Sequence, residues 1–153
     1  MLIVMAKTAT STIRTPELAS QLRLAVLRLA RRLRQHAPVD VTPSQLSALT
    51  SVVREGRVTL SQLAEIERVK PPTVTRIVDA LGQRNLVTRV VDDEDRRVAW
   101  VAATTEGRAL VDTIRRRRDA YLAEHLRNLS DDDRELLARA AVLLERLLED
   151  PEP

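Results

Sequence analysis

The segment that decides the fold is VKPPTVTRIVDALGQRN, residues 69–85. Its two adjacent prolines argue against a strand, because proline has no N–H to donate to a β-ladder. The first turn of a helix tolerates them, since the N–H groups there lack intrahelical partners. The spacing i, i+3, i+4, i+7 then marks one buried helical face, formed by Val74, Ile77, Val78 and Leu81. The segment therefore predicts a helix that starts at the prolines and ends at Asn85, a residue suited to a left-handed C-terminal cap.

The outer face of this helix is small and polar. At about 100° per residue, the side opposite the apolar stripe carries Pro72, Arg76, Asp79 and Gln83, with Thr73 and Thr75 on its flanks. The functional question is what this face, and its proline-bearing end, is meant to contact.

The same type of start signal predicts two helices upstream of this segment. Thr42-Pro43-Ser44-Gln45 and Thr59-Leu60-Ser61-Gln62 each place a threonine three residues before a glutamine, the pattern of a capping box. They predict helices from Pro43 to about Arg54 and from Leu60 to about Glu67. An earlier helix begins near Pro16 and ends before the break HAPVDV, residues 36–41.

Downstream, the β-branched runs LVTRVV (86–91) and RVAWVA (97–102) flank DDEDR and predict a hairpin with a charged tip. A long helix follows from about Thr104, and Ser130 caps a final helix. The predicted order is four helices, two strands and two helices. This is a mainly α fold with a small β-hairpin wing, in the α+β class.

Composition limits the function classes. The chain is 44% hydrophobic but 1% aromatic, so its core must be built from Leu, Val, Ile and Ala. The sequence contains no run of 18 apolar residues, so no membrane span is predicted. Residues 1–15 are expected to be a loose tail, because they lack the basic start of a secretory signal. The absence of cysteine excludes disulfides and thiolate zinc sites, and the cytoplasm is the natural location. A net charge of +3 permits a polyanionic partner without requiring one.

The short helix predicted at 60–67 and the helix that starts at the prolines are separated by about three residues. This arrangement describes a helix-turn-helix, in which the start of the second helix meets base edges in the major groove of double-stranded DNA. The prolines present apolar rings suited to thymine methyls, the threonines can form hydrogen bonds, and the arginine can bind a phosphate or a guanine edge. The helix N-terminus itself favours a phosphate. The predicted recognition-helix contacts are Lys70, Pro71, Pro72, Thr73, Thr75 and Arg76. The hairpin adds Arg96 and Arg97 at a tip suited to a narrow minor groove.

The chain resembles the multiple-antibiotic-resistance-regulator (MarR) family of transcription factors over residues 16–149. The resemblance rests on Leu63-Ala64, on VTRIVDAL (74–81), on LVTR (86–89), on Asp92-x-x-Asp95-Arg96-Arg97 and on Thr104-x-x-Gly107-Arg108. It implies that Asp95 orients a wing arginine. Three positions depart from the family pattern: Glu67, where the family usually has an apolar residue, and Arg68 and Asn85, where it often has glycine.

The resemblance also implies a homodimer joined by N- and C-terminal helices. The apolar stripes at 18–33 and 136–148 agree, because they are wider than one small domain can bury. We therefore expect dimerisation regions at 16–40 and 104–150 and a winged helix-turn-helix DNA-binding region at 41–103. A two-fold dimer would read an inverted repeat as a repressor, and a small-molecule effector would release it by binding better to a dimer with wrongly spaced recognition helices.

Other functions stay open at this point. The chain could be an architectural DNA binder without a defined operator, or a winged helix that binds another protein. Arg76 could pair with Asp95 instead of contacting DNA, and a repressor and an activator share this pattern. An enzyme is not expected, because the sequence has no cysteine, no glycine-rich phosphate loop and no G-x-S-x-G. No cofactor or metal is expected either, since DDED fails the calcium-loop spacing and two histidines are too few for a zinc site.

Overall fold

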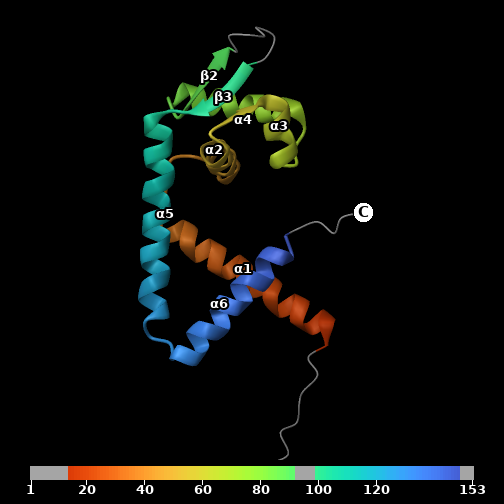
Figure 1. Cartoon of the computed structure of the whole chain (residues 1–153), viewed down its shortest axis with the longest axis vertical. Helices are drawn as coiled ribbons and strands as arrows, with labels where there is room; N and C mark the ends of the chain where they lie inside the picture. Colours follow the sequence, from red (N-terminus) through yellow and green to blue (C-terminus); the bar gives the residue numbers. More distant parts are fainter. Residues whose placement is uncertain (1–13, 92–98, 149–153) are drawn as a thin grey trace, which may run out of the picture. The chain divides into compact units, whose positions relative to one another are not determined.

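The computed structural model describes residues 14–91 and 99–148, and within them it contains six helices and three strands. Their order is α1 (Thr15–His36), α2 (Pro43–Glu55), β1 (Arg57–Thr59), α3 (Leu60–Ile66), α4 (Pro71–Gln83), β2 (Val87–Val91), β3 (Ala99–Ala103), α5 (Thr105–Leu126) and α6 (Asp131–Arg146) (Figure 1). All six predicted helices are present, and the predicted class of a mainly α fold with a β wing is confirmed.

The helix starts follow from local side-chain capping. In both predicted capping boxes the threonine Oγ1 accepts a hydrogen bond from the glutamine N–H, at 3.2 Å for Thr42–Gln45 and 3.2 Å for Thr59–Gln62. The glutamine side chain reciprocates by accepting from the threonine N–H at 2.9 Å in each case. These reciprocal bonds satisfy donors that a helix start otherwise leaves unpaired, so α2 and α3 begin where the sequence predicts.

The prediction of only two strands was wrong. A third strand, β1, pairs antiparallel with β3, which gives a sheet in the order β1-β3-β2. Residue Val58 of β1 lies opposite Val101 of β3, and both are buried. A strand of three residues is too short to show an alternating pattern, and its last residue, Thr59, is also the cap of α3.

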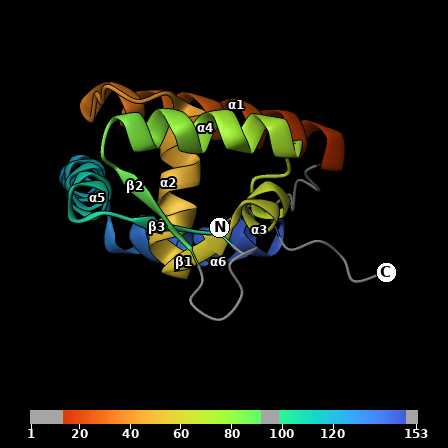
Figure 2. The same ribbon diagram turned by 90° about the horizontal axis from the view of Figure 1, so that it is seen from above.

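The core lies under the helix-turn-helix. The side chains with the least exposure come from α2, α3, α4 and β3, namely Leu49, Val52, Leu63, Val74, Val78, Leu81 and Val101. Figure 2 shows α4 crossing α2, with the first turn of α4 on the side of α3 and its last turn leading into β2. The inner face of α4 is therefore fixed by apolar packing, which leaves its outer face free for another partner.

The start of helix α5 is hydrogen-bonded to the turn that follows α4. The Thr104 N–H donates to the Leu86 carbonyl oxygen at 3.1 Å, and the Thr104 Oγ1 donates to the Asn85 carbonyl oxygen at 2.7 Å. Gly107 lies so close to this turn that a Cβ on it would fall 2.0 Å from the Leu86 oxygen. The glycine therefore permits the close approach of α5 to the exit of α4.

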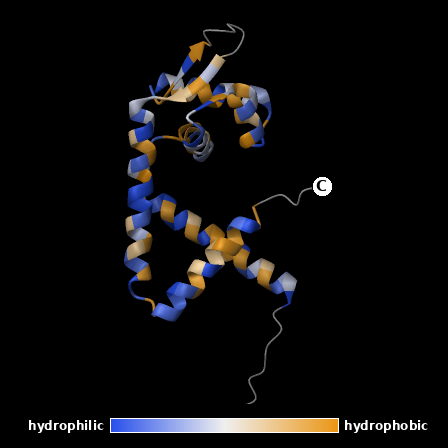
Figure 3. Cartoon of the chain, viewed as in Figure 1, coloured by the Kyte–Doolittle hydropathy of each residue, from blue (hydrophilic) through white to orange (hydrophobic). Residues whose placement is uncertain are grey.

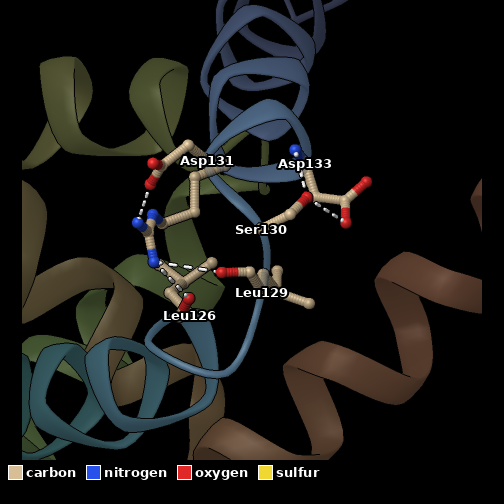
Figure 4. Close-up of polar contacts among 6 residues, drawn as sticks. Leu126, Leu129, Ser130, Asp131 and Asp133 are labelled. Atoms are coloured by element: carbon tan, nitrogen blue, oxygen red, sulfur yellow. Dashed lines mark hydrogen bonds and ion pairs between the residues drawn. The ribbon is translucent and has the colours of Figure 1, made fainter.

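The turn between α5 and α6 is held by polar contacts (Figure 4). The Arg134 guanidinium donates to the carbonyl oxygen of Leu129 at 3.1 Å and pairs with Asp131. The Ser130 Oγ accepts from the Asp133 N–H at 3.1 Å and caps α6. Arginine at this place satisfies a carbonyl that the end of α5 leaves open.

The apolar stripes predicted for dimerisation remain uncovered in the single chain. The chain divides into two compact units between Gln35 and His36, so α1 and α6 belong to different units. Neither helix has a fully buried residue. Figure 3 shows apolar turns along each of them, and the exposed members include Leu24, Leu27 and Leu29 in α1 and Leu136, Leu137 and Leu143 in α6. Within the described residues, no helix combines the length and apolar character that a membrane crossing requires.

Candidate nucleic-acid interface

The helix-turn-helix consists of α3, a short turn and α4. The turn closes tightly, because the Val69 N–H donates to the Ala64 carbonyl oxygen at 3.0 Å. Arg68 adopts a left-handed backbone with φ of 52°, and Asn85 does the same at the end of α4 with φ of 56°. These are two of the three departures from the family pattern, and both occupy a conformation that glycine adopts without strain. The predicted left-handed cap at Asn85 is confirmed.

The third departure, Glu67, is accommodated by a polar partner. Its Oε1 accepts a hydrogen bond of 2.6 Å from the Oγ of Ser51, a side chain of α2 that is 7% exposed. A buried hydroxyl needs such a partner, because leaving it unpaired would cost about 1–3 kcal/mol. Glu67 therefore joins the helix-turn-helix to α2 in place of an apolar contact.

The outer face of α4 has the character that the sequence predicts. Lys70, Pro71, Pro72 and Arg76 are exposed, whereas Thr73 and Thr75 are half-buried on the flanks. The side chains of Lys70 and Arg76 have no hydrogen bond or ion pair with any other residue in 14–91 or 99–148. The outer face of α4 therefore carries two positively charged side chains without a partner among these residues, an arrangement that suits an anionic ligand.

The start of α4 has few backbone donors to offer a ligand. Pro71 and Pro72 have no N–H, and the Thr73 and Val74 N–H groups donate to the Lys70 carbonyl oxygen at 2.9 and 3.3 Å. Lys70, the N-cap residue, makes no side-chain cap. The expectation that this helix N-terminus favours a phosphate therefore stays a prediction, to which the Lys70 side chain could contribute.

The structure brings together only the part of the predicted site that lies on α4. Asp95, Arg96 and Arg97 lie outside the described residues, as does any contact between Asp95 and Arg76. Strands β2 and β3 lead to this segment from Val91 and Ala99, which are paired with each other. The base of the wing is therefore placed beside α4.

Comparison with known proteins identifies the group to which the chain belongs. The sequence pattern of the MarR family matches residues 41–99. An uncharacterised HTH-type transcriptional regulator of Mycobacterium leprae is 42% identical over 134 residues, which cover 87% of this chain and 94% of that protein. This chain belongs to the MarR family. MarR-family proteins are DNA-binding transcriptional regulators, so the chain is an HTH-type regulator and not an enzyme.

Two further relatives support the assignment to the MarR family. The structure of a MarR-family protein from Bacillus stearothermophilus matches with a TM-score of 0.78 at 26% identity, over 87% of this chain and 94% of that one. The HTH-type transcriptional repressor MdtR of Bacillus subtilis is 37% identical over 93 residues, 61% of this chain and 60% of MdtR. The fold is thus the winged helix-turn-helix of the MarR family.

Sequence reasoning missed one contact that orients the wing of this MarR-family regulator. The Arg89 guanidinium of β2 pairs with the Asp79 carboxylate of α4 at 2.6 Å, beside a shallow hollow that Gly82 and Gln83 also line. Both side chains are about half exposed, so the pair contributes less than about 1 kcal/mol to stability. Its effect is geometric, because it ties the wing strand to the recognition helix. Both residues stand in the motif that carries the resemblance, but ten positions of separation give no local sign of pairing.

Trp100 and Arg57 form a second contact across the sheet. The Arg57 guanidinium lies 4.7 Å from the centroid of the Trp100 ring, a cation–π geometry between β1 and β3. Trp100 is half-buried. The partner could not be predicted, because β1 itself was missed.

Proposed function

We propose that this chain is a homodimeric repressor that reads an inverted repeat in double-stranded DNA and is released by a small-molecule effector. The proposed contacts are Lys70, Pro71, Pro72, Thr73, Thr75 and Arg76 on the recognition helix and Arg96 and Arg97 on the wing, with Asp95 orienting a wing arginine. The observation that carries the proposal is the outer face of α4, where cations without a described partner flank a helix whose inner face is buried.

The homodimer is supported by the apolar side chains of α6 and of the two residues that follow it, Leu147 and Leu148. Leu136, Leu143 and Leu147 are 57%, 57% and 72% exposed in the single chain, and Leu148 and Val142 extend the same apolar surface. Large apolar patches on a protein surface mark sites of association. Residues 16–40 and 104–150 would accordingly form the dimerisation region, with residues 41–103 as the DNA-binding region. In a symmetric dimer, each copy would contribute this same surface to the interface.

Repression is supported by the relatives. MdtR is named a repressor, and the Salmonella typhimurium protein MarR, named a multiple antibiotic resistance protein, is 27% identical over 113 residues. A dimer with two recognition helices would bind half-sites about ten base pairs apart, since that is one turn of the duplex. An effector would weaken this binding only by the difference between its affinities for the two states of the dimer. Such a regulator would act in the cytoplasm, where the DNA is.

Selection from a random duplex pool at near-physiological salt tests the proposal. We expect the retained sequences to share an inverted repeat, and light scattering to give the mass of two chains. Retention without a shared sequence, with affinity falling steeply as salt rises, would favour an architectural binder. No retention in the absence of added small molecules would favour a winged helix that binds another protein.

A further inference from the structure

We infer that Ser51 and Glu67 form a positioning pair that fixes the start of the recognition helix, so that operator affinity depends on the hydrogen bond between them. Neither residue lies on α4, and neither is among the proposed DNA contacts. The inference rests on the proposed function, because it gives the pair a role in presenting α4 to the DNA.

Ser51 is an exception in the core of the DNA-binding region. Among residues 14–91 and 99–148, it is the single polar or charged residue that is buried, and its neighbours on α2, Leu49 and Val52, are completely buried. Apolar burial is non-directional. A buried hydroxyl is directional, because only an arrangement that supplies an acceptor avoids the cost of an unpaired polar group. Ser51 therefore favours one placement of the segment that faces it.

Glu67 is the side chain that supplies the acceptor. Its Oε1 accepts the 2.6 Å hydrogen bond from the Ser51 Oγ across 16 positions of the sequence. Glu67 is half-buried and is the C-cap residue of α3, the last residue before the turn of the helix-turn-helix. The hydrogen bond therefore holds the point at which the chain leaves α3. Because the MarR family usually has an apolar residue here, this polar tether is a feature of the present chain.

The turn beyond Glu67 transmits this placement to α4. The Arg68 and Val69 N–H groups donate back into the last turn of α3, at 3.1 and 3.0 Å. With Arg68 in the left-handed conformation, these bonds form a Schellman motif, which leaves the turn little freedom. Lys70 alone lies between Val69 and the first residue of α4. A shift of the C-terminal end of α3 against α2 would therefore displace the start of the recognition helix.

Ser51→Ala is the decisive variant, because it removes the hydrogen-bond donor and leaves every charge in place. Ser47→Ala is its matched control, since Ser47 is exposed on the same helix. Glu67→Gln retains an oxygen acceptor for the hydroxyl and tests rescue by a conservative change. The double variant Ser51→Ala/Glu67→Leu replaces both polar partners by apolar groups, a change that is close to neutral when the packing is kept.

Amide hydrogen exchange without DNA separates local positioning from general stability. In Ser51→Ala, the exchange of the Val69 amide should accelerate about fivefold more than that of the Leu86 amide, which donates to the Leu81 carbonyl oxygen beyond the other end of α4. Ser47→Ala should change neither amide. Equal acceleration at Val69 and Leu86 would show only a loss of overall stability and would overturn the inference.

Operator affinity tests the functional part on the duplex selected by the protein. Ser51→Ala should bind it about fivefold more weakly per half-site, within the range of coupling between residues in contact, and should bind random DNA as the wild type does. Ser47→Ala and Glu67→Gln should match the wild type, and the double variant should recover most of the loss. An unchanged operator affinity in Ser51→Ala would overturn the inference and leave the proposed function standing. If no operator is selected, the proposed function fails and the inference fails with it.

Discussion

Replacement of Gly107 by alanine tests how tightly α5 is seated on the DNA-binding region. The added Cβ would lie 2.0 Å from the Leu86 carbonyl oxygen and 3.2 Å from Cδ1 of Leu49. A real Cβ is essentially never found within 3.0 Å of such an atom, so α5 and the turn after α4 must separate by about 1 Å. The opposing atom belongs to the backbone and cannot swing aside as a side chain could.

The magnitude follows from three contributions. Overpacking against a rigid neighbour costs about 3 kcal/mol, the upper part of its usual range. The separation also weakens the two hydrogen bonds from Thr104 to Leu86 and Asn85, at about 1 kcal/mol each. Alanine offsets about 1 kcal/mol through its higher helix propensity. We therefore expect Gly107→Ala to lower the free energy of unfolding by about 4 kcal/mol, a large share of the roughly 5–15 kcal/mol of a typical domain.

Urea unfolding at equal protein concentration measures this change, with Trp100 fluorescence and circular dichroism as independent signals, because Trp100 is the single tryptophan of the chain. With a slope of about 2 kcal/mol per molar urea, the midpoint should fall by about 2 M. Gly82→Ala is the matched control, since its Cβ would meet only the Val87 carbonyl oxygen of β2, at 4.0 Å. Because this contact with β2 lies at ordinary van der Waals distance, Gly82→Ala should be neutral or stabilising. A loss below about 1 kcal/mol for Gly107→Ala, or an equal loss for Gly82→Ala, would refute the reasoning.

Three further substitutions test the proposed interface and dimer. Arg97→Ala should weaken binding to all duplexes alike and lower the slope of log affinity against log salt by about one; an unchanged affinity in a salt titration would remove the wing from the interface. Thr75→Ala should cost about 1–3 kcal/mol on the selected operator and less on random DNA, and equal losses in the two titrations would place Thr75 on the phosphate backbone. Leu143→Glu should convert the dimer to a monomer in light scattering, while Glu145→Arg, exposed on the opposite side of α6, leaves it intact; a dimer that survives Leu143→Glu would exclude this face from association.

The sequence was sufficient where structure is determined by neighbours along the chain. The capping threonines, the prolines at the start of α4 and the cap at Asn85 act within a few residues, so the helix bounds could be predicted closely. The strand β1 could not, because its partner β3 begins about forty residues later and no local pattern reveals the pairing. The pairs Asp79–Arg89 and Ser51–Glu67 were missed for the same reason.

For the candidate site, the exposed face of α4 was predicted from helical periodicity alone. Its polar groups were not, because the sequence does not show which N–H groups find a partner. Thr73 and Val74 both donate their N–H groups to the Lys70 carbonyl oxygen, and only the structure shows this. The expectation that this helix start favours a phosphate stays a prediction.

The seat of α5 has a mechanical consequence. The helix spans 22 residues, or about 33 Å at 1.5 Å per residue, and its first turn is fixed to the exit of the recognition helix. A rigid rod held at one end acts as a lever, so a tilt of about 5° at that end displaces the other by about 3 Å. Conversely, a displacement of a few ångströms near Leu126 would be transmitted to α4 as a small rotation. In the proposed dimer, small rotations would misalign two recognition helices that must fit successive turns of one duplex.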